Sequence, residues 1–176
     1  MQFVILGLLL SEPLTLYEVR TRFTAGISLF YSASFGSLQR ALQVLVRDGS
    51  VTVTAAPGDA RGRKLHAITE QGERQWREWM LAPVEPGVEA ERVILAKVFL
   101  LGGLRPADRA VSLAGVRAAV AEQADALGRL ASELDAVDVP AEHRELYHYQ
   151  RATLDYGLRS SAVLLDWVDE LCGDLS

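Results

Sequence analysis

Two short runs of strand-forming residues, VTVTAA from Val51 and KLHAI ending at Ile68, stand on either side of a Pro57-Gly58-Asp59 turn. Alternating valine and threonine is typical of a half-exposed strand, and proline followed by glycine is typical of a turn. The segment therefore predicts an antiparallel β-hairpin with a loop several residues long. The patterns on both sides of it are helical, so we expect a mainly α-helical fold in which one hairpin interrupts a series of helices.

The residues before the hairpin predict three helices. Residues 2–10 are apolar nearly all round and indicate a short buried helix. Residues 16–23 (LYEVRTRF) follow Thr15, which can cap a second helix. A third segment starts at Ser34 (SFGSLQRALQVLVRDG), places its leucines on one stripe and ends at Asp48-Gly49, a typical helix stop.

The order of these elements is that of a winged helix-turn-helix domain over residues 1–82. Three helices are followed by the hairpin and by a fourth helix, which Thr69 can cap. In this arrangement the helix before the hairpin enters the major groove of DNA, and the hairpin, called the wing, reaches along the duplex. We therefore predict a DNA-binding domain with a two-stranded wing.

Residues 83–176 predict a second, wholly helical domain. Pro83 and Pro86 mark a junction that a helix cannot easily cross. Helices are expected over residues 89–101, from Pro106 to about Val137, and from Pro140 onward. Apolar residues in the long middle helix recur at steps of three, four and seven, which is typical of a seam that needs a partner helix.

Charge is unevenly distributed along the chain, whose formal net charge is −5. Residues 1–80 contain 9 basic and 7 acidic side chains, whereas residues 81–176 contain 9 basic and 16 acidic ones. A mildly basic half followed by an acidic half suggests two different tasks. Cys172 is the only cysteine and no apolar run is long enough to span a bilayer, so a cytoplasmic protein without membrane contact is expected.

The hairpin loop concentrates positive charge in Arg61, Arg63 and Lys64. Charged loops are common, and a solvated turn is one interpretation of these residues. Because the loop follows a helix of the recognition type, we instead predict that the three side chains contact DNA phosphates. Phosphate attraction supplies most of the sequence-independent affinity of a DNA-binding protein.

The helix before the hairpin offers both phosphate and base contacts. Ser34 and Ser37 in its first turn suit a close approach to phosphate, although Ser34 is also expected to act as an ordinary N-cap. Gln39 and Arg40 are the candidates for base contacts, because both side chains can make bidentate hydrogen bonds to base edges.

Several motifs make the chain resemble the PadR family of transcriptional regulators over essentially its whole length. They are ILGLL (5–9), YEV (17–19), YSASFGSLQRAL (31–42), DGSV (48–51) and GRKLHAITEQG (62–72). The C-terminal pattern, VILAKVFLLGG followed by two long helices, resembles the family's Vir-like subgroup. The resemblance implies a homodimer that binds operator DNA, usually as a repressor relieved by a ligand or signal, with dimer contacts from the C-terminal helices.

Carried over by position, the resemblance implies DNA contacts from the second helix, from the start of the recognition helix and from the wing tip. The residues at these positions are Tyr17, Ser34, Phe35, Gly36, Ser37, Arg40, Arg63 and Lys64. The chain departs from the family pattern at Leu16, where members usually carry glycine, so the packing of the second helix is expected to differ. The wing also lacks a proline that is common between its basic residues, which favours a more mobile loop.

Trp76 and Trp79 have two interpretations. Both fit plain core or dimer-interface aromatics. In some relatives, however, aromatic residues line a flat cavity at the dimer interface that takes planar drugs or phenolic acids, so a small planar or phenolic effector at these tryptophans is a hypothesis. No cofactor or metal is expected, because His143 and His148 are five positions apart on a helix and diverge.

Two functions from different classes remain open. The first is a sequence-specific regulator that binds a near-palindromic operator as a homodimer. The second is a winged-helix protein-interaction module that does not bind DNA, and the acidic overall charge favours it. An enzyme is not expected, since the sequence contains no catalytic motif.

Overall fold

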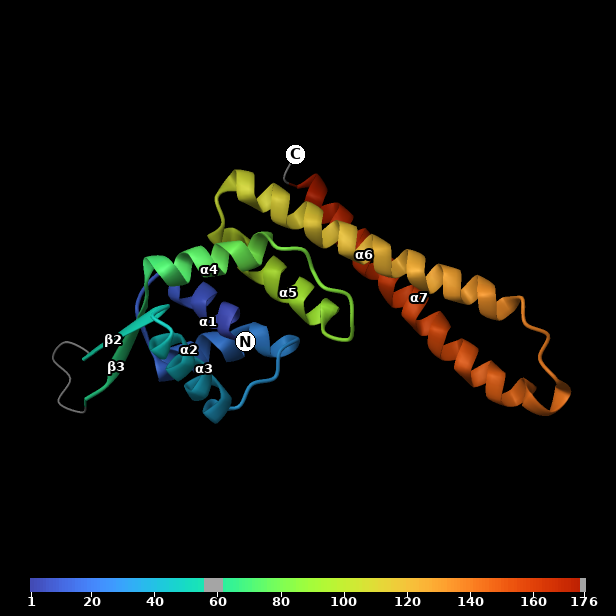
Figure 1. Ribbon diagram of the computed structural model, residues 1–176, viewed down its shortest axis with the longest axis horizontal. Helices are drawn as coiled ribbons and strands as arrows, with labels where there is room; N and C mark the ends of the chain where they lie inside the picture. The colour runs from blue at the N-terminus through green and yellow to red at the C-terminus, as the bar shows by residue number, and fades with distance from the viewer. Residues whose placement is uncertain (56–61, 175–176) are drawn as a thin grey trace. The chain divides into compact units, whose positions relative to one another are not determined.

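The computed structural model describes residues 1–55 and 62–174 and is mainly α-helical, with one small antiparallel sheet (Figure 1). The chain divides into two compact units: Met1–Ala82 with Val88–Ser112, and Pro83–Gly87 with the residues from Leu113 onward. Residues 88–112 thus pack with the N-terminal unit, beyond the predicted boundary at residue 82. The functional division into a DNA-binding and a dimerisation domain stays a prediction.

Three of the five helices in the described part of the first unit begin at a side-chain cap. The five helices are α1 (Gln2–Leu9), α2 (Leu16–Ala25), α3 (Phe35–Arg47), α4 (Glu70–Leu81) and α5 (Ala90–Leu100), with short 3₁₀ turns at Ile27–Leu29 and Leu101–Gly103. Thr15 and Glu18 form a reciprocal capping box on α2, and Thr69 Oγ1 accepts the Gly72 N–H on α4. Gly49 has a φ of 77° directly after α3, the left-handed conformation that glycine adopts most easily.

The sheet has three strands rather than the two of the predicted hairpin. β2 (Val51–Ala55) and β3 (Lys64–Ile68) pair antiparallel as predicted, with Val53 opposite His66. A third strand, β1 (Leu14–Thr15), pairs with the other edge of β3 and places Leu14 opposite His66. The strand order is therefore β1-β3-β2, and the wing is tied to the start of α2.

The core of the first unit is apolar and draws on all five helices. Its most buried side chains include Ile5, Leu6, Val19, Phe23, Leu38, Leu42, Trp76, Met80 and Ala96. α1 buries five of its eight residues, which confirms the prediction of a short, buried helix. Because α3 packs its leucine stripe against this core, its polar face must point away from it.

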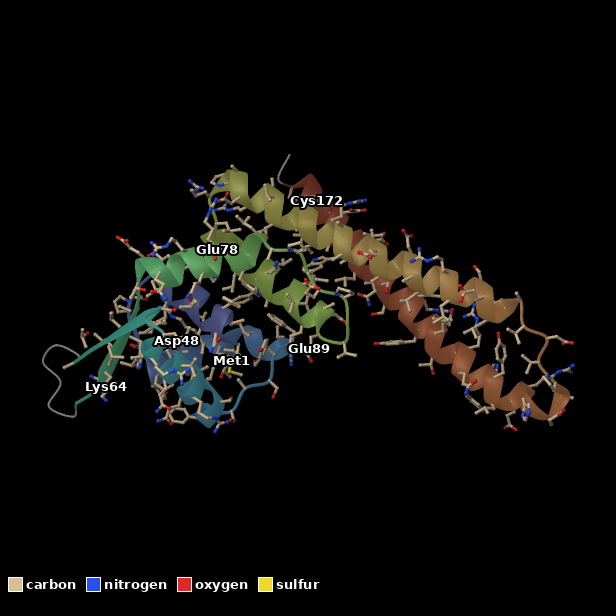
Figure 2. All side chains as sticks on the ribbon, viewed as in Figure 1. Met1, Asp48, Lys64, Glu78, Glu89 and Cys172 are labelled. Carbon is tan, nitrogen blue, oxygen red and sulfur yellow. The ribbon has the colours of Figure 1, made fainter. Side chains whose placement is uncertain are left out.

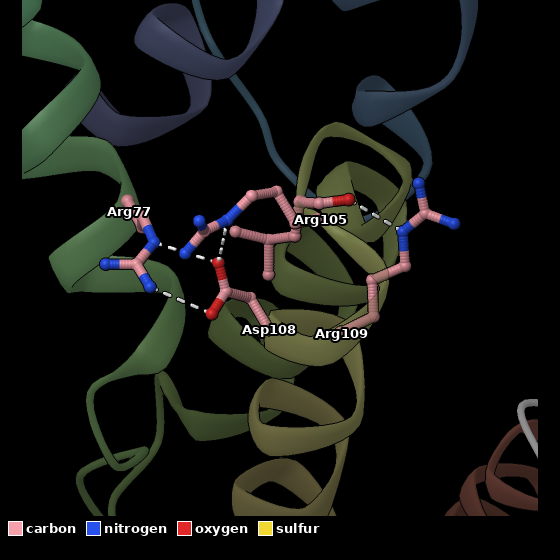
Figure 3. Close-up of polar contacts among 5 residues, drawn as sticks. Arg77, Arg105, Asp108 and Arg109 are labelled. Atoms are coloured by element: carbon pink, nitrogen blue, oxygen red, sulfur yellow. Dashed lines mark hydrogen bonds and ion pairs between the residues drawn. The ribbon is translucent and has the colours of Figure 1, made fainter.

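The first turn of α6 (Pro106–Asp135) is anchored to α4 by Asp108 (Figure 3). Arg77 donates from Nε and Nη2 to the two carboxylate oxygens at 2.9 and 2.8 Å, and Arg105 Nε donates at 3.1 Å. These hydrogen bonds, that of Arg77 above all, lower the pKa of Asp108 to about 2. Ser112 Oγ also donates to Met80 O at 2.8 Å, so two polar ties hold the start of α6 on α4.

The second unit is an antiparallel helical hairpin of α6, from Leu113, and α7 (Arg144–Gly173), which lie side by side in Figure 1. Their buried apolar residues are Leu113, Val116, Val120 and Ala131 of α6 and Leu154 and Val168 of α7. Two ion pairs between the helices, one near each end of the hairpin, fix their register. Arg117 Nε donates to Asp169 Oδ1 at 2.5 Å, and Arg151 Nε donates to Asp135 Oδ1 at 2.7 Å.

The sequence predicted that the last helix begins at Pro140, and this prediction is wrong. Pro140 has an extended ψ of 147°, so the chain passes through a 3₁₀ turn at Ala141–His143 before α7 starts at Arg144. No helix in the described part of the chain is long and apolar enough to cross a membrane.

Candidate nucleic-acid interface

α3 has a buried apolar face and an exposed polar face. Leu38, Leu42 and Leu45 are buried in the core, whereas Gln39, Arg40 and Gln43 are exposed. Gln39 and Arg40, the two predicted base-contacting residues, therefore both lie on the side of the helix that is free to meet a ligand. This face belongs to the helix directly before the hairpin, as a recognition helix requires.

The N-terminus of α3 is ordered by its two serines. Ser34 Oγ accepts the Ser37 N–H at 3.1 Å, and Ser37 Oγ donates back to Ser34 O at 2.7 Å, which confirms the predicted cap. A Cβ built on Gly36 would meet only Arg40 Nη1 at 3.7 Å and Ser34 Oγ at 4.0 Å. The space beside Gly36 is therefore open, so a phosphate can approach the backbone closely at this position.

A groove of about 520 Å³ lies between the start of α2, the polar face of α3 and the wing strands. Its lining brings together four of the predicted DNA-contacting residues: Tyr17, Gln39, Arg63 and Lys64. The remaining lining residues are Thr15, Leu16, Leu42, Gln43, Val46, Val53 and His66. Figure 2 shows Lys64 at the start of β3. None of the described residues that line the groove carries a carboxylate, so this described lining is basic although the whole chain is acidic.

The predicted residues do not all line this groove. Ser34, Phe35, Gly36, Ser37 and Arg40 lie along the first turns of α3, outside the groove lining. Arg61 lies outside the described residues.

Arg20 is a further cation beside α3, and the sequence prediction did not include it. Its guanidinium carbon lies 5.8 Å from the centre of the Phe35 ring, so α2 places a cation beside the first residue of α3. Arg20 also shares the exposed face of α2 with Tyr17, which is 70% exposed. The spacing of three positions from Tyr17 was the available signal, because such residues share one face of a helix.

Trp76 and Trp79 occupy different environments. Trp76 is 3% exposed, and Cβ atoms built on Gly7 and Gly103 would lie 2.9 and 3.0 Å from its ring, so it fills the core. Its Nε1 is the one buried side-chain nitrogen or oxygen in the described part of the chain without a hydrogen-bond partner. Trp79 instead borders a cavity of about 570 Å³. Its ring stacks on that of Phe3, with 5.2 Å between the ring centres.

Lys97 is a buried cation next to Trp79. It is 2% exposed, its Nζ donates to Ala82 O, and Nζ lies 5.6 Å from the centre of the Trp79 ring. No ion pair joins it to any described carboxylate. Burial lowers the pKa of Lys97 to about 8, because the charged ammonium loses its hydration.

Lys97→Met is expected to raise the free energy of unfolding at pH 7 by about 1–2 kcal/mol, because a buried unpaired charge is removed and its volume is kept. Between pH 8 and the ordinary lysine pKa of 10.5, Lys97 is deprotonated in the folded protein but still protonated in the unfolded chain. The free energy of unfolding of the wild type should therefore rise with pH over this range, and the variant should lack that rise. Urea denaturation at pH 7 and pH 10 measures both effects. Arg129→Met, at an exposed position of α6, should change stability by less than about 0.5 kcal/mol. A less stable Lys97→Met protein would show that the contacts with Ala82 and Trp79 outweigh desolvation.

Comparison with known proteins identifies the family. Residues 5–78 match the sequence profile of the transcriptional regulator PadR-like family, and residues 92–176 match that of the virulence activator alpha C-term. The probable transcriptional regulator Rv1176c of Mycobacterium tuberculosis is 27% identical over 172 residues, covering 88% of this chain and 86% of that protein. The negative transcriptional regulator PadR of Bacillus subtilis is 25% identical over 99 residues, covering 54% of each.

Solved structures are similar over nearly the whole chain. Bacillus subtilis PadR in complex with operator DNA has a TM-score of 0.45 and 18% identity, covering 98% of this chain and 96% of that one. The Vibrio cholerae virulence activator AphA has a TM-score of 0.43 and 22% identity, covering 99% and 96%. The predicted family and the predicted absence of an enzymatic role are confirmed by the matched profiles. With a PadR-like segment at residues 5–78 and a virulence-activator segment at residues 92–176, the chain belongs to the PadR-like family of transcriptional regulators.

Proposed function

We propose that the protein is a cytoplasmic repressor that binds a near-palindromic operator as a homodimer. The observation that carries this proposal is the basic groove between α2, α3 and the wing. It joins side chains from three segments that are far apart in the sequence, and none of the lining residues that the structure describes is acidic. A surface that repelled DNA or docked a basic partner would have the opposite charge.

Each part of the interface has a separate task in this proposal. Gln39 and Arg40 on the exposed face of α3 contact base edges in the major groove, because both can make paired hydrogen bonds there. The first turn of α3, with Ser34 to Ser37, receives a phosphate at its N–H groups. Arg63 and Lys64 on the wing, with Tyr17 and Arg20 on α2, hold the flanking sugar-phosphate backbone.

The homodimer proposal is supported by an exposed stripe on α7. Tyr149, Tyr156 and Val163 are 65%, 74% and 70% exposed and recur every seven residues. Leu154 and Val168, which are buried, lie on another side of the same helix. Aromatic and apolar residues repeating at this interval are typical of a helix–helix seam, and α6 already covers the other face. A second copy of α7 supplies a matching stripe.

An effector that relieves repression is proposed at Trp79 rather than at Trp76, because Trp76 fills the core. The cavity beside Trp79 has a volume suited to a small planar molecule and is bordered by Phe3 and Leu6. It is also bordered by the carboxylates of Asp48 and Glu78, and none of its lining residues is Lys or Arg. This charge favours a planar cation over a phenolic acid. Tryptophan quenching by planar amines and by phenolic acids compares the two classes.

The double variant Arg63→Ala/Lys64→Ala tests the DNA-binding proposal. Fluorescence anisotropy with the DNA upstream of the protein's own gene, and with a scrambled duplex, gives the dissociation constant across a salt series. Each phosphate contact contributes about 0.9 to the slope of log K against log salt. The magnitude of the slope should therefore decrease by about 3.6 in a dimer that loses two contacts from each of two wings.

The matched control is Arg129→Ala/Arg144→Ala, which removes the same charge from exposed positions on the helices of the second unit. It should leave the salt slope close to that of the wild type. An unchanged slope in the wing variant would remove Arg63 and Lys64 from the phosphate contacts. Absence of wild-type binding to either duplex at low salt would overturn operator binding and favour the protein-interaction module.

A further inference from the structure

His66 occupies the middle of the wing sheet. It stands opposite Leu14 of β1 on one side and opposite Val53 of β2 on the other. Its ring is half-buried, and it borders the basic groove together with Gln39, Gln43, Arg63 and Lys64. A titratable ring therefore lies in the wall of the surface assigned to DNA.

The hydrogen bond of His66 fixes which ring nitrogen carries a proton. Nδ1 lies 3.3 Å from Leu14 O, and a carbonyl oxygen can only accept. The neutral ring must therefore hold its proton on Nδ1 to make this bond, which leaves Nε2 as an acceptor. Nε2 has no partner among the described residues. A phosphate oxygen is also an acceptor, so His66 can bond both groups only when its ring is doubly protonated and positively charged.

Burial, and to a smaller extent the charge of Lys64, opposes that state in the free protein. Burial is the main cause of a lowered pKa for His66, Lys64 lowers it further, and the bond to Leu14 O raises it. The other titratable groups in the lining are Tyr17 of α2 and Arg63, while α3 and β2 contribute only uncharged residues. Glu18 lies near Arg63, but its carboxylate is held by the Thr15 N–H at 2.7 Å and by the Thr15 hydroxyl.

We propose that His66 is a phosphate-binding residue of the operator interface, whose protonated Nε2 donates to a DNA phosphate oxygen while Nδ1 still donates to Leu14 O. The inference rests on the proposed function. A proton is taken up from solvent at each half-site when DNA binds, because the incoming phosphate supplies the negative charge that the groove lacks. By linkage, operator affinity rises as the pH falls.

The test is fluorescence anisotropy with operator DNA from pH 5.5 to pH 8.5 at constant ionic strength. The wild-type dissociation constant should be about tenfold or more higher at pH 8 than at pH 6, because each pKa unit gained on binding is worth a factor of ten. His66→Gln offers an uncharged donor near the position of Nε2 and should bind with little dependence on pH over this range. His143→Gln/His148→Gln removes the other two histidines and should keep the wild-type pH dependence.

A second measurement is independent of the variants. With three histidines in the chain, nuclear magnetic resonance can follow the pKa of His66 in the free protein and in the complex, and DNA should raise it. An equal pH dependence in wild type and His66→Gln, or an unchanged pKa of His66 on adding DNA, would overturn the proposal while leaving operator binding intact. Absence of operator binding by the wild type at every pH would overturn the proposed function and this inference with it.

Discussion

Gly72→Ala is expected to lower the free energy of unfolding by about 2–4 kcal/mol, the largest stability loss that we expect from adding a single methyl group to this chain. A Cβ at Gly72 would lie 2.2 Å from Ser50 O and 2.9 Å from Ile68 Cγ1. Ser50 O cannot move away easily, because it accepts the Thr69 N–H at 3.0 Å. The clash therefore falls on backbone at Ser50, directly before β2, where α4 packs against the end of β3.

The sign of this effect opposes helix propensity. Alanine is normally favoured over glycine in a helix by about 1 kcal/mol. Gly128→Ala in α6 is the matched control, because a Cβ there would meet nothing within 4 Å. Urea denaturation followed by circular dichroism should show Gly128→Ala slightly more stable than wild type and Gly72→Ala much less stable. Equal stability of Gly72→Ala and wild type would mean that α4 can separate from the wing at no cost.

Local chemistry explains why much of the fold was predictable. The caps at Thr15, Ser34 and Thr69 each act within three residues, so the sequence alone specifies them. β1 was not predictable in this way. It has only two residues, Leu14 and Thr15. They are extended because they pair with His66 and Leu65 of β3, about fifty positions later in the chain. Such a strand exists only through its tertiary partner.

The same distinction applies to the candidate interface. The exposure of Gln39 and Arg40 could be predicted, because the leucine stripe of α3 sets which of its faces is exposed. The roles proposed for Arg20 and His66 depend on neighbours from other elements, Phe35 in one case and Leu14 in the other. For Trp76 the sequence left core and effector contact open, and only the packing against Gly7 and Gly103 assigns it to the core.

Tyr156→Glu is expected to dissociate the proposed homodimer, raising its dissociation constant by about a hundredfold or more. Tyr156 lies in the middle of the exposed stripe of α7, between Tyr149 and Val163. In a two-fold interface each protomer contributes its own copy, so the substitution buries two like charges and removes two aromatic contacts. Sedimentation velocity at a series of protein concentrations measures the shift from dimer to monomer.

The matched control is Ala162→Glu, which adds the same charge at an exposed position of α7. Ala162 lies six positions after Tyr156 and faces away from the stripe, because successive residues of a helix are rotated by about 100°. This variant should remain dimeric. Of the two variants, only Tyr156→Glu should lose operator affinity together with dimerisation. A dimer that contacts both half-sites of the operator binds far more tightly than two separate monomers. A Tyr156→Glu protein that stays dimeric would place the interface elsewhere on the chain. A monomeric Tyr156→Glu protein with undiminished operator affinity would show that a single α3 and wing suffice for recognition.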